Sequence, residues 1–395
     1  MESVTSPAII ELRKTPLNAL HRRLGAKMVN FGGWDMPVEY PSSGGLLAEH
    51  RAVRNRVGVF DVSHMGDIRI GAGRKPGGAL AAVQHLSMND ASRLEIGQAH
   101  YSAMLYPEGT FVDDVIVHRL GEEDYLLVIN AGTREKDIRW VRDNTKSFDC
   151  VVQDLSEVYT QLAIQGPQAV DAVQKLTDAN LSAIKNYWFT HGTVCGLKNI
   201  LIARTGYTGE DGFEIYVPAD RATSEEVWAR VMEAGCAFGI VPCGLGARNT
   251  LRLEGRMALY GHEISEKINV WEAGLDRYCK IEKGDFIGRA ALERARAAGL
   301  TRTLVGLEMI DRGIARDEYR VCDESGAAVG VITSGSPSPT LSKNIALAYV
   351  PPALAAVGTV LYVEIRAQKC KAQVVPTPFY KRPKKAAAPQ TAKKV

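Results

Sequence analysis

Three short apolar runs separated by polar spacers dominate the chain between residues 101 and 130. The runs are rich in β-branched and aromatic residues and lie at 101–106, 111–118 and 125–130. Gly109 stands in the first spacer and Gly121 in the second, and short spacers with glycine are typical of strands that pair with their neighbours in sequence. The pattern therefore predicts an antiparallel meander, followed by a helix from about Thr133 to Asp143.

A second mixture of strand and helix patterns begins near residue 159. It predicts a hairpin formed by strands at 200–204 and 213–217, and helices at 224–235 and 247–253. The segment 302–375 then changes to short β-rich runs with glycine, serine and proline between them. That change predicts a small C-terminal β-barrel or sandwich.

Length and composition are those of an ordinary globular protein. A chain of 395 residues is longer than one domain with a single hydrophobic core usually is, so two or three domains are expected. Hydrophobic residues make up 46% and charged residues 24%, and the net charge of +3 is too small to indicate a nucleic-acid partner. Residues 381–395 hold five lysines and one arginine with no acidic residue, which predicts a disordered basic tail.

The cysteines and the hydrophobic stretches indicate the compartment. Seven cysteines, with no CxxC spacing, favour reduced thiols and give no sign of a zinc site. His64 and His262 are isolated, so they are interpreted as structural. The chain has no stretch of 18 apolar residues, and its first 16 residues lack the apolar core of a signal peptide. These features predict a cytoplasmic protein with no membrane span and no bound metal.

Asp113 and Asp114 stand together in an apolar run and form the first candidate site. Side chains alternate across a strand, so the two carboxylates face opposite ways. Asp114 shares its face with Ile116, whereas Asp113 shares the other face with Val115 and Val117. A carboxylate on a mostly apolar strand is costly unless it is paired, hydrogen-bonded or used. We therefore expect one of the two to be a site residue.

Two other segments combine charged residues with glycine. Residues 205–214 contain three glycines within seven residues, which permit tight turning or a close approach to a ligand. Glu214 alternates there with two apolar neighbours, and from this pattern alone it is interpreted as solvent-facing. Arg248 stands at a predicted helix start, where a cation is locally unfavourable, so an anionic partner is expected. The preceding Gly-Leu-Gly lacks the third glycine of a dinucleotide loop, and such a site is not favoured.

Ten short motifs, taken together, resemble those of a known family. They follow the family's order and extend over nearly the whole chain, from residue 14 to residue 379. They lie at 14–17, 31–34, 37–38, 60–65, 113–114, 165–167, 206–212, 244–248, 333–335 and 378–379. With these motifs the chain resembles the aminomethyltransferases of the glycine cleavage system, the T-protein family.

The resemblance implies an α+β fold in which three domains form a cloverleaf around a central folate channel. Two of the domains are then discontinuous, one covering 1–62 and 152–243 and the other covering 63–151 and 244–292. The third, a β-barrel-like C-terminal domain, covers 293–380. The pattern of hydrophobic positions alone does not indicate this interleaving.

The resemblance also implies a reaction and its partners. Members of the family take an aminomethyl group from the lipoyl arm of the H-protein, transfer its methylene to tetrahydrofolate and release ammonia. Tetrahydrofolate is thus expected as co-substrate and the lipoylated H-protein as partner, with no nucleic acid and no membrane. The second aspartate of the family's motif is catalytic, which corresponds to Asp114. Asp113 is then expected to be structural and to satisfy a turn after Gly109.

Seven further residues correspond to folate contacts of the family. Glu214 is expected to hydrogen-bond the pterin ring and Arg248 to contact the folate. The remaining five are expected to line the pocket, and they are Tyr101, Tyr207, Ile116, Met65 and Tyr278.

Two other functions are weighed against this one. A folate-dependent demethylase of the same superfamily would share the folate pocket but would need no H-protein, and the lack of a fused flavin domain disfavours it. A non-catalytic folate-binding paralogue would lack the aspartate pattern and carry a reactive cysteine motif, so the presence of Asp114 disfavours it.

Overall fold

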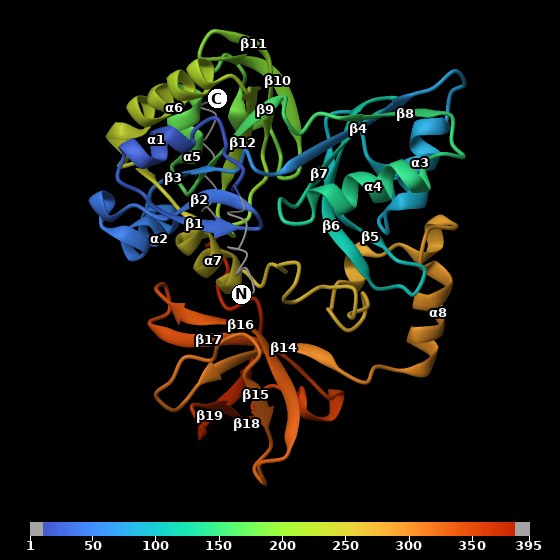
Figure 1. Ribbon diagram of the computed structural model, residues 1–395, viewed down its shortest axis with the longest axis vertical. Helices are drawn as coiled ribbons and strands as arrows, with labels where there is room; N and C mark the ends of the chain where they lie inside the picture. Colours follow the sequence, from blue (N-terminus) through green and yellow to red (C-terminus); the bar gives the residue numbers. More distant parts are fainter. Residues whose placement is uncertain (1–10, 384–395) are drawn as a thin grey trace, which may run out of the picture.

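The computed structural model describes residues 11–383, which form three lobes (Figure 1). Two lobes combine helices with a sheet, and the third is a closed β-barrel. The predicted α+β cloverleaf with a C-terminal β domain is thereby confirmed. Most of the predicted basic tail, 381–395, lies outside the described residues.

A six-stranded sheet forms the first lobe, in the order β10-β11-β12-β9-β3-β13. Only β13 and β3 are parallel. The strands are β3 (Gly58–Asp61), β9 (Tyr159–Gln165), β10 (Phe189–Val194), β11 (Leu197–Ala203), β12 (Gly212–Pro218) and β13 (Val241–Pro242). Helices α5 (Ala169–Gln174) and α6 (Arg221–Gly235) pack against the face of β12 that carries Phe213 and Ile215. The predicted hairpin is confirmed as the antiparallel pair β11 and β12.

The N-terminal part of the chain completes this lobe. It contains α1 (Asn18–Arg23), the antiparallel pair β1 (Lys27–Phe31) and β2 (Trp34–Glu39), and α2 (Gly45–Asn55).

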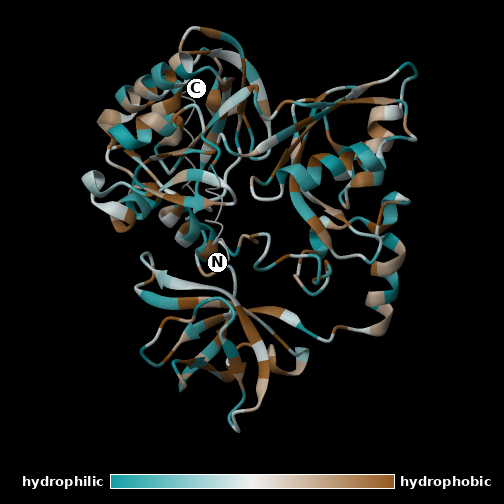
Figure 2. Ribbon diagram, in the orientation of Figure 1, coloured by the Kyte–Doolittle hydropathy of each residue, from teal (hydrophilic) through white to brown (hydrophobic). Residues whose placement is uncertain are grey.

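A five-stranded antiparallel sheet forms the second lobe, in the order β5-β6-β7-β4-β8. The strands are β4 (Gly66–Ala72), β5 (Ala99–Leu105), β6 (Phe111–Gly121), β7 (Asp124–Ile129) and β8 (Cys150–Asp154). Helices α3 (Gly78–Leu86) and α4 (Arg134–Asn144) pack on the face that carries Val115 and Val117. The predicted meander and the helix after it are thus confirmed. Figure 2 shows that α4 is mostly hydrophilic, as expected for a helix with one buried side.

The third lobe is a six-stranded barrel that closes because β14 pairs with both β17 and β19. Helices α7 (Leu245–Glu254) and α8 (Arg289–Ala298) precede it along the chain. Its strands are β14 (Thr303–Met309), β15 (Arg320–Cys322), β16 (Ala328–Ser338), β17 (Lys343–Val350), β18 (Val360–Ile365) and β19 (Gln368–Val375). The structure therefore decides between the barrel and the sandwich that the sequence left open.

The two sheets pack against each other through the faces that their helices leave uncovered. Leu126 and Val128 of β7 share one hydrophobic cluster with Leu201 of β11 and Tyr216 of β12. In sequence, every strand of the second sheet lies between β3 and β9 of the first. The exact domain bounds stay a prediction. Among the described residues no helix is long and apolar enough to cross a membrane, and the cytoplasmic location stays a prediction too.

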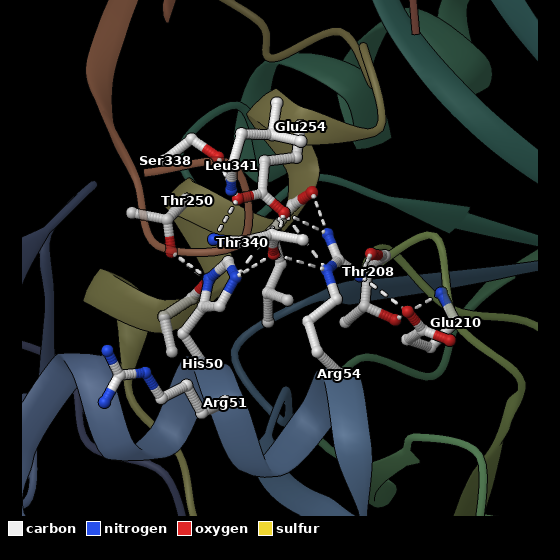
Figure 3. A network of polar contacts seen from close by, with 12 residues as sticks. His50, Arg51, Arg54, Thr208, Glu210, Thr250, Glu254, Ser338, Thr340 and Leu341 are labelled. Carbon is white, nitrogen blue, oxygen red and sulfur yellow. Dashed lines mark hydrogen bonds and ion pairs between the residues drawn. The ribbon is translucent and has the colours of Figure 1, made fainter. Parts of the chain in front are cut away.

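A buried network centred on Arg54 joins the first lobe to the barrel (Figure 3). Arg54, on α2, donates from Nη2 to Oε2 of Glu254 on α7 over 2.8 Å, and from Nη1 to the carbonyl of Thr208 over 2.6 Å. Glu254 also accepts hydrogen bonds from the hydroxyl groups of Ser338 and Thr340, which belong to the barrel lobe.

The charge of Glu254 is held in place by these partners. Burial opposes ionisation, but the hydrogen bonds and charges of His50, Ser338 and Arg54 lower the pKa of Glu254 to about 2. His50 also connects α7 with the barrel lobe. Its Nδ1 is 2.8 Å from Oγ1 of Thr250 on α7, and its Nε2 is 2.8 Å from Oγ1 of Thr340 in the barrel lobe. Glu254 is therefore ionised throughout the neutral range.

We expect Glu254→Gln to lower the free energy of unfolding by about 3 kcal/mol, because it removes one of the two buried carboxylates that pair with Arg54 and leaves only Glu210. The control is Lys343→Met, which breaks an exposed pair with Glu308 and should cost about 1 kcal/mol or less. Urea denaturation of the three proteins measures both effects. A loss in Glu254→Gln no larger than that in the control would contradict the assigned role.

Candidate active site

Strand β6 carries its two aspartates on opposite faces, and only one of these faces lies at the interface of the two sheets. Val115 and Val117 lie in the core under α3 and α4, whereas Ile116 packs against the cluster between the sheets. By strand alternation, Asp114 faces the first lobe and Asp113 faces α4. The structure thus separates the two carboxylates as the sequence pattern predicts.

Two donors hold the carboxyl group of Asp114. Tyr101, on β5, donates from its hydroxyl to Oδ2 over 3.0 Å, and Asn130, just after β7, donates from Nδ2 to Oδ1 over 2.7 Å. Burial and the neighbouring Asp113 outweigh these donors and raise the pKa of Asp114 to about 7. Near neutral pH this carboxyl group is therefore poised to accept a proton and to return it.

Asp113 is fully buried and makes its contacts inside the second lobe. Its Oδ1 accepts a hydrogen bond from Asn130 Nδ2 over 2.9 Å, and its Oδ2 accepts one from the hydroxyl group of Thr133. Its partners therefore lie between β7 and α4, and the prediction that it satisfies a turn after Gly109 was wrong. Its side-chain donors come from the chain just after β7, and neither belongs to the turn after Gly109.

Glu214, on β12, faces the second lobe. Its neighbours Phe213 and Ile215 point into the core under α5 and α6, and Tyr216, which shares its face, lies in the cluster between the sheets. The hydroxyl group of Thr205 donates to Oε2 of Glu214, and burial raises the pKa of this carboxyl group. The interpretation as a solvent-facing residue was wrong, because the second lobe covers that face of the sheet.

Arg248, on α7, lies beside an aromatic ring. Its guanidinium carbon is 4.5 Å from the ring centroid of Tyr207, and the Tyr207 hydroxyl donates to the backbone carbonyl of Ala258, which fixes the ring. Arg252, one turn later, pairs with the buried Glu263 over 2.7 Å. Within the described residues no carboxylate forms an ion pair with Arg248, so the expected anionic partner is not found there.

The glycines of 205–212 allow this loop to lie close to the sheet. A Cβ atom on Gly206 would stand 2.0 Å from Oε1 of Gln165. Any other residue there would therefore displace either the side chain of Gln165 or the loop, which carries Tyr207 beside Arg248.

Aromatic and apolar side chains complete the arrangement. The rings of Tyr101 and Tyr278 have centroids 4.7 Å apart. Met65 and Ile116 both pack against the cluster between the sheets. All eight residues predicted for the site are partly exposed rather than fully buried, as expected for side chains that line a ligand site.

The direct contacts among the predicted residues form two groups. One joins Asp114, Tyr101 and Tyr278, and the other joins Tyr207 and Arg248. Glu214 touches neither group directly, but Tyr187 lies near it. Tyr187 is 39% exposed, and desolvation and the charges of Tyr278, Glu214 and Asp114 are among the causes that raise its pKa to about 12.

Sequence reasoning missed Tyr187 and Asn130. Tyr187 precedes β10 and has a φ of 60°, a conformation that tyrosine rarely adopts. Asn130 ends an apolar strand, where a polar residue is usual. Neither position carries a local signal, because each acts through residues that are distant in sequence.

Three kinds of group meet at one interface. They are a carboxyl group that titrates near neutral pH, a cation stacked on an aromatic ring, and further aromatic side chains. Such a set suits a flat polar substrate and a proton transfer, as in the active site of an enzyme. No three His, Cys, Asp or Glu residues of the described ranges are grouped to hold a metal ion.

The chain belongs to the glycine cleavage T-protein family. The family model for the GCVT N-terminal domain matches residues 17–283, and that for the glycine cleavage T-protein C-terminal barrel domain matches residues 302–381. The chain is an aminomethyltransferase, as the following relatives also indicate.

Curated relatives and one solved structure match nearly the whole chain. An aminomethyltransferase of Acidobacterium capsulatum is 67% identical over 98% of this chain and 100% of its own length. One from Koribacter versatilis is 65% identical over 96% of this chain and 99% of its own. The crystal structure of the glycine cleavage system aminomethyltransferase T from Bartonella henselae superposes with a TM-score of 0.86 at 33% identity, covering 94% of this chain and 99% of that one.

The rate of aminomethyl transfer should rise with pH through about 7, because only the ionised form of Asp114 can accept a proton and its pKa is about 7. Tyr101→Phe removes a hydrogen bond that lowers this pKa, so the rise should move to higher pH. The dependence of kcat on pH for both proteins measures the effect. A rise that stays at the same pH in Tyr101→Phe would contradict the link between the tyrosine and Asp114.

Proposed function

We propose that tetrahydrofolate binds against Asp114 and Glu214, at the interface of the two sheets. There it accepts the methylene of an aminomethyl group delivered on the lipoyl arm of the H-protein. The C–N and C–S bonds of that group break, and the products are 5,10-methylenetetrahydrofolate, ammonia and the free thiol of the dihydrolipoyl arm, with the protons of N5 and N10 going to the two leaving groups. The observation that carries the proposal is that the two carboxylates, from two different sheets, face the same interface. The matching family and the aminomethyltransferase relatives support it.

The side chains present suit such a ligand. Glu214 has one hydroxyl donor, from Thr205, and its remaining lone pairs can accept hydrogen bonds from the amino and N–H groups of a pterin. Donors from a ligand would also offset the cost of burying this carboxylate. Arg248 presents a planar guanidinium without a carboxylate partner in the described part of the chain, and can bind polar atoms at another edge of the ligand.

Each residue near Asp114 then has a defined task. Tetrahydrofolate, when bound, supplies the two nitrogens N5 and N10 that come to share the methylene. Asp114 lies where positive charge develops and stabilises it, and it accepts the proton that N10 loses. Tyr101 and Asn130 orient its carboxyl group through their hydrogen bonds. Proton transfer to a positioned group contributes roughly 10²–10⁴-fold to the rate.

The test is ammonia release from aminomethylated H-protein in the presence of tetrahydrofolate. We expect the wild-type protein to be active and Asp114→Asn to lose at least about 100-fold in kcat. Asp113→Asn should lose much less, because that carboxyl group faces α4. An inactive wild-type protein would overturn the proposal, and activity on a small N-methylated substrate without H-protein would support the demethylase instead. Equal losses in the two variants would contradict the assignment of Asp114.

A further inference from the structure

Behind Asp114 lies a second carboxyl group that the proposed reaction does not use. Asp137, on α4, is fully buried, and its carboxyl group is within hydrogen-bonding distance of that of Asp113. Thr133 and Lys136 are the donor side chains beside this carboxyl group, but neither makes a well-aligned hydrogen bond with it. The ammonium group of Lys136 stands 3.5 Å from its Oδ1.

The two carboxyl groups have unequal surroundings. Asp113 accepts hydrogen bonds from the backbone N–H of Asp114, from the amide of Asn130 and from the hydroxyl group of Thr133. Asp137 has Thr133 and Lys136 beside it, and both donate elsewhere. The hydroxyl group of Thr133 donates to Asp113, and the ammonium group of Lys136 donates to the carbonyl of Val112 and to the hydroxyl of Tyr260. Burial raises the pKa of both carboxyl groups.

Two buried carboxylates in contact cannot both stay ionised, since neither has enough counter-charge. One proton placed between them supplies the donor that Asp137 lacks and leaves the pair with a single negative charge. The charged groups that face the pair are Asp114 on β6 and Lys136 on α4, and Tyr260 is the further titratable group nearby.

We propose that Asp113 and Asp137 share one proton, and that this carboxyl pair sets the pH at which Asp114 ionises. Asp137 is then a positioning residue, which acts on the reaction through Asp113. The connection is short, because Nδ2 of Asn130 donates to Asp113 and to Asp114 over 2.9 and 2.7 Å. This inference rests on the proposed function, in which Asp114 takes up the proton.

The proposal predicts pH shifts in opposite directions for two variants, because each variant leaves the negative charge on a different carboxyl group. Asp137→Asn leaves the negative charge on Asp113, next to Asp114, and the pH at which kcat rises should increase by about one unit. Asp113→Asn leaves the charge on Asp137, farther away, and the rise should move to lower pH. The matched control is Asp143→Asn, which removes an exposed carboxylate from the same helix and should change nothing.

The other charge states of the pair predict other results. If both carboxyl groups were ionised, each substitution would remove one negative charge, and the rise of kcat would move to lower pH in both variants. If both were neutral, neither rise would move. Either result overturns the proposal. If Asp137→Asn does not fold, Asp137→Leu replaces the carboxyl group with an apolar one of similar volume and predicts the same upward shift.

A second measurement needs neither H-protein nor folate. In the unfolded chain at about pH 6.5 both aspartates are ionised, so unfolding of the wild-type protein releases the shared proton. Unfolding in denaturant with a pH indicator should release fewer protons from both variants than from the wild type or from Asp143→Asn. The deficit should be slightly less than one proton in Asp137→Asn, where Asp114 is more fully protonated, and more than one proton in Asp113→Asn, where Asp114 is more ionised. An unchanged release would overturn the shared proton. A wild-type protein without transfer activity would overturn the proposed function alone.

Discussion

The buried pair of Arg54 and Glu254 is the interaction on which the relative placement of the lobes depends. Arg54 belongs to the first lobe, Glu254 lies on the helix that leads toward the barrel, and Thr340 of the barrel lobe bonds to both. The same guanidinium donates to the carbonyl of Thr208, in the glycine-rich loop that carries Tyr207. One buried charge pair thus links the barrel to the loop that fixes the position of Arg248.

The site itself depends on a second constraint, the alternation of side chains on strands that pack face to face. Strands β6 and β12 each turn one face to their own helices and the other to the opposite sheet. Asp114 and Glu214 stand on the shared side, where apolar neighbours bury them and raise the pKa of each. Burial that disfavours a charged carboxylate costs stability, and it also keeps Asp114 near the pH at which a proton can move in both directions.

Local sequence patterns predicted the elements that form between neighbouring segments of the chain. The meander, its helix and the hairpin follow from runs and glycine spacers, and the opposite facing of Asp113 and Asp114 follows from the period of a strand. The burial of Glu214 was not predicted, because the sheet that covers its face comes from a different part of the chain. For the same reason no sequence pattern indicated a role for Tyr187, Asn130 or Asp137. The interleaving of the two sheets was predicted only from the family resemblance.

The central claim is that Asp114 carries the chemistry while Glu214 holds the ligand. Calorimetric titration of tetrahydrofolate into Asp114→Asn and Glu214→Gln separates the two roles most directly. The account predicts that Asp114→Asn binds tetrahydrofolate about as well as the wild type, and that Glu214→Gln binds at least about tenfold more weakly, the equivalent of about 1.4 kcal/mol. Unchanged binding in Glu214→Gln would contradict the account.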